Sequence, residues 1–285
     1  MPAWLSKFGR LLRKGEFRAL GRRACWHLRW ALRRRPWSIR TATGFPLLVC
    51  RTGSAALIYY QGASEPETTR FLLRFLAAGM HVVDVGAHFG EYTVLAARCI
   101  APHGWVHAFE PQPELFALLK QNVALNGIRN SVLNRLAVAD RSGEMVFWER
   151  FELASSSIGA KWLPGSDVRQ SYVVGSTTLD DYCQSHQFRP NLVKVDAEGA
   201  ELLVVNGASG LCSLPPHEAP VWLLEYSPTA CARLGQQAEL LPARLRAFGY
   251  QCFALDGDGR AQPFPEPIPP DVPTFNLVAS KQGPL

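Results

Sequence analysis

The sequence predicts an α/β protein in which a mostly parallel, seven-stranded sheet carries helices on both faces. From about residue 67 onward, short apolar runs alternate with segments of helical periodicity, a pattern typical of parallel strands joined by right-handed crossovers. The composition agrees, because 47% of the 285 residues are hydrophobic and 19% are charged. Such a chain can bury a sizeable core, which excludes an intrinsically disordered protein.

The elements of this domain are expected in a regular order. Short runs rich in apolar and β-branched residues predict strands at residues 81–85, 105–109, 132–138, 192–195, 221–224, 251–255 and 275–279. Helical periodicity predicts helices at residues 67–78, 92–100, 114–125 and 179–185. We expect residues 144–148 and 172–174 to be extended, and the Pro- and Gly-rich residues 256–273 to form a loop.

Charge sets the first forty residues apart. They contain twelve basic residues and one acid, a net charge of +11, so the rest of the chain carries −5 of the total +6. Apolar residues recur there at helical spacing: Trp4, Leu5, Phe8, Leu11, Leu12, Phe17, Leu20, Ala24, Leu28 and Ala31. We expect a basic amphipathic arm at 1–40. A hairpin-like lead-in at 41–66, with apolar runs at 45–50 and 55–60, should connect the arm to the main domain at 67–285.

The sequence indicates a cytoplasmic protein. It contains no run of about 18 apolar residues that could span a bilayer, and its N-terminus lacks the pattern of a signal peptide. The seven cysteines are irregularly spaced without a Cys-x-x-Cys pair, which indicates neither a disulfide framework nor a zinc site. Peripheral contact with the inner face of the membrane is one interpretation of the basic arm.

The most informative segment joins the first strand of the main domain to the following helix. Asp84 ends the strand, and Gly86 and Gly90 open the helix, where glycine allows a sharp turn and close approach of a ligand. Glu110 ends the second strand, at a point where a carboxylate accepts both hydroxyls of a ribose. This arrangement predicts a nucleoside-cofactor site at the carboxyl ends of the strands.

The charge at the turn favours S-adenosylmethionine over a dinucleotide. A dinucleotide site typically has Gly-x-Gly-x-x-Gly, whereas this turn reads Asp-x-Gly-x-x-x-Gly with His88 near the place of the middle glycine. The Asp84 anion repels phosphate, but it suits the cationic tail of S-adenosylmethionine. The alternative of a plain tight turn is less favoured, because the acids at both strand ends fall in register with it.

Four stretches resemble the FkbM-type S-adenosylmethionine-dependent methyltransferases. They are residues 83–93, 109–111, 178–182 and 193–201, and the resemblance extends over about residues 65–280. The Lys-x-Asp-x-Glu-Gly-x-Glu run in the last stretch is not generic to Rossmann folds. The resemblance implies a Rossmann-like class I methyltransferase fold and O-methylation of hydroxyls on sugars, glycans or polyketides. His88 is a modest departure, because this position is often Asn in the family.

The candidate cofactor contacts lie at three strand ends. They are Asp84, Gly86, His88, Gly90, Tyr92, Thr93, Glu110, Pro111, Ala137 and Asp140. Ala137 falls where many methyltransferases place an acid near adenine, and its backbone could serve there. Asp140 is the nearby alternative, although formation of a turn before Ser142 would also explain it.

Asp196 and Glu198 are the candidate catalytic residues. Asp196 ends the fourth strand, and Glu198 and Glu201 follow so closely that one carboxylate should have a raised pKa suited to a general base. The alternative is that Glu198 and Glu201 cap the next helix. Glu225 and Tyr226 end the fifth strand as candidate acceptor contacts, with simple burial as the alternative. We expect no metal site, because no His accompanies these carboxylates.

Two enzyme functions follow. The favoured one is an O-methyltransferase whose hydroxyl-bearing acceptor, a small molecule or glycan, is held by residues 141–190 and 256–273. The alternative is an RNA methyltransferase that grips nucleic acid with the arm, although residues 197–199 lack the Pro-Pro-aromatic turn usual in base N-methylation. The acids Asp84 and Glu110 disfavour two other functions, a binding module without activity and an NAD oxidoreductase. The arm itself could contact an anionic membrane, a protein partner or RNA.

Overall fold

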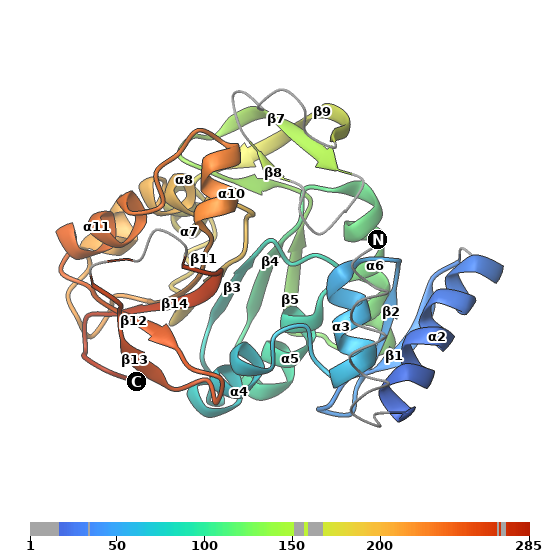
Figure 1. The fold of residues 1–285 in the computed structure, drawn as a ribbon. Coiled ribbons are helices and arrows are strands. Elements are labelled where there is room, and N and C mark those ends of the chain that lie inside the picture. The colour runs from blue at the N-terminus through green and yellow to red at the C-terminus, as the bar shows by residue number, and fades with distance from the viewer. Residues whose placement is uncertain (1–16, 34, 151–156, 159–167, 267, 269–271) are drawn as a thin grey trace. The chain divides into compact units, whose positions relative to one another are not determined.

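The computed structural model describes residues 17–33, 35–150, 157–158, 168–266, 268 and 272–285 (Figure 1). The chain divides into two compact units, residues 1–66 and residues 67–285. No helix in the described residues is both long and apolar enough to cross a membrane.

Within its described residues, the first unit contains two helices and a hairpin. They are α2 (Phe17–Leu32), β1 (Trp37–Arg40), β2 (Pro46–Val49) and α3 (Gly53–Gln61), with β1 antiparallel to β2. The extended run expected at residues 55–60 is wrong, because these residues belong to α3. The Thr52 side chain accepts a hydrogen bond from the Ala55 N–H at 3.2 Å and so starts a helix there.

The buried face of α2 differs from the expected stripe. Trp26 and Trp30 are 3% and 4% exposed, and the Trp26 ring stacks on that of Tyr59 from α3 with centroids 5.6 Å apart. Ala24 and Leu28 from the expected stripe are instead exposed. Large aromatic rings bury more apolar area than alanine or leucine, which explains why the tryptophan side of the helix packs. The expected arm residues before Phe17 lie outside the described residues.

The second unit is built on an eight-stranded sheet (Figure 1). Its parallel part contains, in spatial order, β5 (Ser131–Asn134), β4 (Val106–Phe109), β3 (Val82–Val85), β10 (Leu192–Val195) and β11 (Val221–Tyr226). Beyond β11 follow β14 (Phe275–Ser280), β12 (Gln251–Leu255) and β13 (Ala261–Pro263), each antiparallel to its neighbour. The predicted α/β architecture is confirmed, with one strand more than the expected seven.

The extra strand, β13, comes from the segment expected to be a loop. The Asp256 carboxylate accepts hydrogen bonds from the N–H groups of Asp258 and Arg260 at 2.9 Å each. These bonds close a tight turn, after which residues 261–263 pair with β12.

Helices cover both faces of this sheet. They are α4 (Pro66–Phe75), α5 (Glu91–Ile100), α6 (Pro113–Leu125), α7 (Leu179–Ser185), α8 (Glu201–Asn206), α9 (Ser209–Ser213), α10 (Pro228–Arg233) and α11 (Leu240–Ala247). Side chains of α7, α8, α9 and α11 pack on one face, in a core that includes Val83, Val195 and Trp222. On the other face α5 packs against β3 and β4. The helices at 228–233 and 240–247 were not predicted, because six to eight residues are too few for a clear helical period.

A second sheet is inserted in the chain between β5 and β10. Its spatial order is β6 (Ala137–Val138), β9 (Val168–Thr177), β7 (Gly143–Arg150) and β8 (Ser157–Ile158). The expectation of one strand over 132–138 is therefore wrong. The Asn134 amide donates to the Ala108 carbonyl at 3.2 Å and to the Tyr182 hydroxyl at 2.9 Å, which fixes the end of β5. The chain then leaves the main sheet.

The inserted sheet packs beside the end of β10. Its inner side chains Met145, Phe147 and Val174 share one small core with Ala200, just after that strand. Figure 1 shows β7 and β9 on the same side of the molecule as α8 and α10. The inserted sheet thus borders the residues that follow β10.

Candidate functional site

The loops after β3, β4 and β10 converge at the carboxyl edge of the main sheet. The Gly86 N–H donates to the Phe109 carbonyl at 3.0 Å, and the Asp196 N–H donates to the Val85 carbonyl at 3.0 Å. A Cβ on Gly86 would lie 1.9 Å from the Asp196 carbonyl oxygen, and Gly86 has φ of +77°. Only glycine combines this backbone angle with such close approach, so the sequence motif builds a narrow cradle.

Glu110 lies at the rim of this cradle and is 5% exposed. Its Oε2 accepts the His88 N–H at 2.8 Å, and its Oε1 accepts the Gln112 N–H at 2.8 Å. Burial raises the pKa of Glu110 to about 7, although both hydrogen bonds oppose the rise. Each carboxylate oxygen can accept a further hydrogen bond, so the side chain can take two ribose hydroxyls.

Asp84 lies deeper and is 2% exposed. The Thr93 hydroxyl donates to its Oδ2 at 2.6 Å, whereas Oδ1 has no hydrogen-bond partner among the described residues. Burial raises the pKa of Asp84, and Lys194 and Thr93 counteract the rise. A buried carboxylate oxygen without a partner is costly, and a cationic ligand would satisfy it.

His88 occupies the left-handed region with φ of +53°. Its Nε2 is buried without a hydrogen-bond partner in the described part of the chain. Burial lowers the pKa of His88 to about 4, so the imidazole is neutral at physiological pH. The unpartnered atoms of Asp84 and His88, with the glycine cradle, fit a polar ligand that bears a cationic group.

The turn after β10 is tied by Glu201. This side chain, 1% exposed, accepts the N–H groups of Ala197 at 2.8 Å and Gly199 at 3.1 Å. Glu201 is the first residue of α8, and its carboxylate thus binds the turn before that helix, at a helix start where the described residues show no side-chain cap hydrogen bond. Gly199 has φ of +102°, and a Cβ there would lie 2.6 Å from the Ala230 carbonyl oxygen, so α10 packs directly on the turn.

Glu198 has a different environment from Glu201. It has φ of +52°, and no hydrogen bond of its carboxylate to the turn is seen among the described residues. Burial and the neighbouring charges of Asp196 and Glu201 raise the pKa of Glu198 well above its ordinary value. Arg233, at the end of α10, and Arg150, at the end of β7, counteract this rise.

Three carboxylates meet next to this turn. Oxygens of Asp196, Glu198 and Glu225 lie within 4.8 Å of one another. Carboxylates this close share a proton or a cation, and an acidic cluster by itself does not distinguish the two. Glu225, at the end of β11, therefore belongs to the same site as the two candidate catalytic residues.

Some candidate residues lie away from this cluster. Tyr226 is 1% exposed and packs against Phe264 and Phe275, which leaves no surface for an acceptor to touch. Ala137 is buried in β6 and pairs with β9 instead of ending a strand of the main sheet. Asp140 is exposed and lies beside Gly207 after α8. The expected positions of Ala137 and Asp140 were wrong because the third strand ends earlier.

The remaining cofactor candidates follow the first glycine turn. Gly90 precedes α5 with φ of +93°, and Thr93 contacts Asp84 as described above. Tyr92 is 8% exposed and lies under the ammonium group of Lys194, 4.7 Å from its ring centre. Pro111 follows Glu110 at the rim.

Lys194 is the residue that the sequence interpretation left without a role. It lies in the middle of β10, is 4% exposed, and places Nζ 3.3 Å from Oδ2 of Asp196. The sequence signal that could have identified Lys194 is a charged residue inside a strand whose other side chains are apolar. The acceptor pocket expected from residues 141–190 lies in part outside the described residues.

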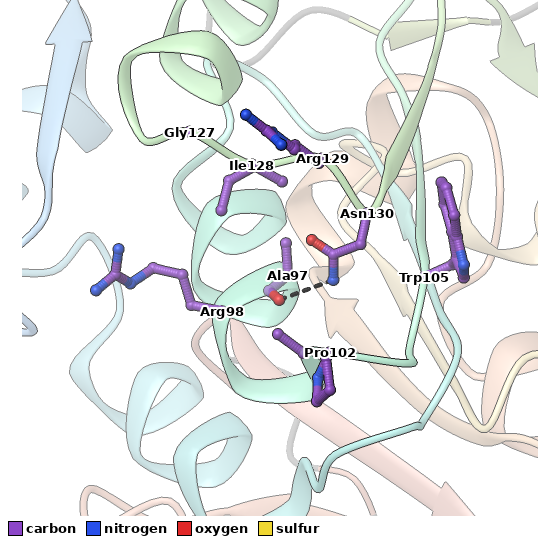
Figure 2. A pocket seen from close by; sticks show the side chains of 9 residues that line it. Ala97, Arg98, Pro102, Trp105, Gly127, Ile128, Arg129 and Asn130 are labelled. Atoms are coloured by element: carbon purple, nitrogen blue, oxygen red, sulfur yellow. Dashed lines mark hydrogen bonds between the residues drawn. The ribbon is translucent and has the colours of Figure 1, made fainter.

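A separate hollow lies at the opposite, amino-terminal edge of the sheet. It measures about 590 Å³ and lies between the end of α5 and the segment that follows α6. Figure 2 shows Asn130 at its centre, donating to the Ala97 carbonyl at 2.9 Å, while the Arg98 side chain points away from it. None of the candidate site residues lines this hollow.

The topology and the acids together define the class of protein. Five parallel strands in the order β5-β4-β3-β10-β11 are followed by an antiparallel β14, and acids follow or end three neighbouring strands at their carboxyl edge. This is the class I fold of S-adenosylmethionine-dependent methyltransferases. Residues 84–252 match the family model described as the methyltransferase FkbM domain. The chain belongs to that family, and its cofactor is S-adenosylmethionine.

Two curated relatives are similar over part of their length. The hexuronic acid methyltransferase AglP of Haloferax volcanii is 28% identical over 153 residues, which cover 50% of this chain and 56% of AglP. The 31-O-demethyl-FK506 methyltransferase FkbM of Streptomyces tacrolimicus is 33% identical over 123 residues, or 41% of this chain and 45% of FkbM. The chain thus matches about half the length of each.

The similarity to solved structures is weaker than the similarity to these two relatives. A precorrin-6y C5,15-methyltransferase from Geobacter metallireducens superposes with a TM-score of 0.43 at 14% identity, covering 78% of this chain and 88% of that one. Similarity at this level bears on neither substrate nor mechanism.

Proposed function

We propose that the protein transfers the methyl group of S-adenosylmethionine to a hydroxyl oxygen of a sugar, a glycan or a related metabolite. The observation that carries the proposal is the position of Glu198, a carboxylate with a raised pKa, beside Asp196 at the edge that holds the cofactor cradle. The names of AglP and FkbM, a hexuronic acid and an O-demethyl methyltransferase, support acceptors of this class.

Each acid has a separate task in this proposal. Glu110 accepts the ribose hydroxyls, and Asp84 faces the cationic amino-acid tail. The cofactor, when bound, supplies a methyl group made electrophilic by its sulfonium. The glycine cradle at Gly86 fixes the distance between the turn after β3 and the turn after β10. Such positioning of two reactants can supply about 7–11 kcal/mol in favourable cases.

Glu198 is the proposed general base. A hydroxyl is a weak nucleophile until its proton leaves, and a base contributes about 10²–10⁴-fold to such a reaction. A base works best when its pKa lies near the operating pH, and burial beside Asp196 and Glu201 moves Glu198 in that direction. Asp196 and Glu225 then line the place where the acceptor hydroxyl meets the base.

A transfer assay tests this function. Protein is incubated with methyl-labelled S-adenosylmethionine and, in parallel, with free glycans, lipid-linked glycans or total RNA. We expect label in a glycan fraction, loss of labelling with Glu198→Gln, and no loss with Glu144→Gln, which removes an exposed carboxylate on β7. Label in RNA alone would replace the proposal by the RNA methyltransferase alternative.

We also propose that α2 holds the protein at an anionic membrane surface, on the cytoplasmic side. Leu28 and Leu32 are 59% and 73% exposed on a helix whose other side is buried. Residues 17–40 contain eight arginines and no acid. An exposed apolar stripe within a basic segment suits the interface of a bilayer with anionic lipids, and lipid-linked glycans would then be natural acceptors.

Liposome flotation tests the membrane contact on the full chain. With vesicles that contain anionic lipid, we expect wild type to float and Leu28→Asp/Leu32→Asp to remain at the bottom. Leu125→Asp is the matched control, because it changes an exposed leucine, 46% accessible, on α6 of the other unit. If all three proteins float equally, or if none of them floats, the membrane contact is rejected. A protein partner or RNA would then be the remaining ligand for the arm.

A further inference from the structure

A buried lysine lies between two acids of the cofactor site. Lys194 is 4% exposed, and it is the only lysine or arginine that is buried within the described residues. In the parallel register of β10 and β3 it is directly opposite Asp84, and its Nζ lies 3.3 Å from Oδ2 of Asp196. The same Nζ lies 4.7 Å from the centre of the Tyr92 ring.

The strand geometry explains why these groups meet. Lys194 points to the face of β10 that α5 covers, since its ammonium lies over Tyr92 of that helix, and the carboxylate of Asp196, the residue after β10, reaches the same ammonium. Asp84 is on that face as well, since its carboxylate accepts a hydrogen bond from Thr93 of α5. A buried ammonium is stable only when opposite charges and hydrogen bonds compensate it, and the two acids provide that compensation.

The charges around this group come from several elements. The cofactor side contains Asp84 from β3, the neutral His88 from the glycine turn and Tyr92 from α5. The acceptor side contains three acids, Glu198 and Glu201 from the turn after β10 and Glu225 from β11. It also contains two arginines, Arg150 from β7 and Arg233 from α10. Arg150 and Arg233 act on Glu198. Lys194 acts on Asp84 and Asp196, on the cofactor side.

We propose that Lys194 is a positioning residue, whose ammonium favours the ionised form of Asp84 and fixes the Asp196 carboxylate between the cofactor cradle and the acceptor. Ionised Asp84 can meet the cationic tail of the cofactor. The contact of Lys194 with Asp196 holds that carboxylate in place beside Glu198, the proposed base. The inference deepens the proposed function, but its test needs no acceptor and no methyl transfer.

The test follows the two aspartates directly. Protein labelled with ¹³C on aspartate side-chain carboxyl carbons is titrated by nuclear magnetic resonance, and Asp84→Asn and Asp196→Asn assign the two signals. Glutamates, Glu110 included, are silent in this experiment. Removing a neighbouring cation raises a carboxyl pKa by about 1–3 units, so Lys194→Met should raise the Asp84 titration by roughly one unit or more.

Two further variants separate charge from shape. Lys194→Arg keeps the charge, and we expect it to restore the wild-type titration. Lys120→Met removes an exposed lysine of α6 and should leave both signals unchanged. A Lys194→Met protein whose Asp84 titrates as in wild type would overturn the inference, because a purely structural lysine would alter stability without moving that titration.

The inference stays testable if Lys194→Met does not fold. Lys194→Gln, which keeps a hydrogen-bond donor without the charge, is then titrated in its place. An Asp84 titration that is the same in Lys194→Gln as in wild type would overturn the inference. Methyl transfer to a glycan could still be found in that case, so the two proposals fail separately.

Discussion

Replacement of Gly86 by alanine tests the cofactor cradle most sharply. The added Cβ would lie 1.9 Å from the Asp196 carbonyl oxygen, and contacts under 3.0 Å are essentially never seen for a real Cβ, so the two turns must separate by more than 1 Å. Both turns are held by backbone hydrogen bonds of 3.0 Å to neighbouring strands. The separation therefore breaks or bends at least one of these bonds.

Two costs add up in Gly86→Ala. Alanine in the left-handed region costs about 1–2 kcal/mol, and forcing extra volume into a packed site typically costs about 1–3 kcal/mol. We expect the free energy of unfolding to fall by roughly 2–5 kcal/mol. A displacement of about 1 Å can cost about 10²-fold in a reaction site, and we expect a loss of that order in affinity for S-adenosylhomocysteine.

Gly249→Ala provides the matched control. Gly249 has φ of +86°, but nothing lies within 4 Å of its added Cβ. This variant should lose only the backbone contribution and keep its affinity for the ligand. Titration calorimetry with S-adenosylhomocysteine and thermal unfolding are measured on both variants. Equal affinity in the two would refute the reasoning, because the carbonyl contact would then not shape the site.

Three other outcomes follow from the carboxylates. Glu198→Gln should lower the rate of methyl transfer by about 10²–10⁴-fold while calorimetry shows unchanged cofactor binding; a fully active variant would assign the base elsewhere. Glu201→Ala should remove the hydrogen bonds that the N–H groups of Ala197 and Gly199 donate to this side chain and lower the free energy of unfolding by about 2–4 kcal/mol, whereas wild-type stability would contradict its role in holding the turn. The pKa of Glu110 is raised from 4.5 to about 7. The contribution of this group to the free energy of unfolding should therefore be full below pH 4.5 and should fall by about 3 kcal/mol as pH rises through 7. Denaturant unfolding at several pH values should show a smaller fall in Glu110→Gln, and an identical fall would contradict the assignment.

The order of the main elements was predictable because it follows from local patterns. Buried parallel strands read as short apolar runs, and the strands at 192–195 and 251–255 have the expected bounds. The glycine turn and the acids after it also carry their signal locally. Glu110 could be placed at a strand end from spacing alone, since the topology brings the carboxyl ends of parallel strands to one edge.

The remaining features depend on contacts between distant residues. Nothing in residues 137–138 tells that they pair with β9, about forty residues later, and not with β4. Burial of Tyr226 depends on Phe264 and Phe275, which arrive from a later part of the chain. Glu201 differs from Glu198 because its carboxylate accepts backbone N–H groups of the turn, and sequence spacing leaves open which of the two acids does so.

Calorimetry on Glu110→Ala tests the central claim most directly, since the account depends on a carboxylate at the end of β4 that holds the nucleoside of S-adenosylmethionine. Wild type should bind S-adenosylmethionine and S-adenosylhomocysteine but not NAD, and Glu110→Ala should lose both sulfur compounds, while Glu144→Ala, at an exposed position, should keep them. Undiminished binding by Glu110→Ala, or binding of NAD in place of the sulfur compounds by wild type, would contradict the account.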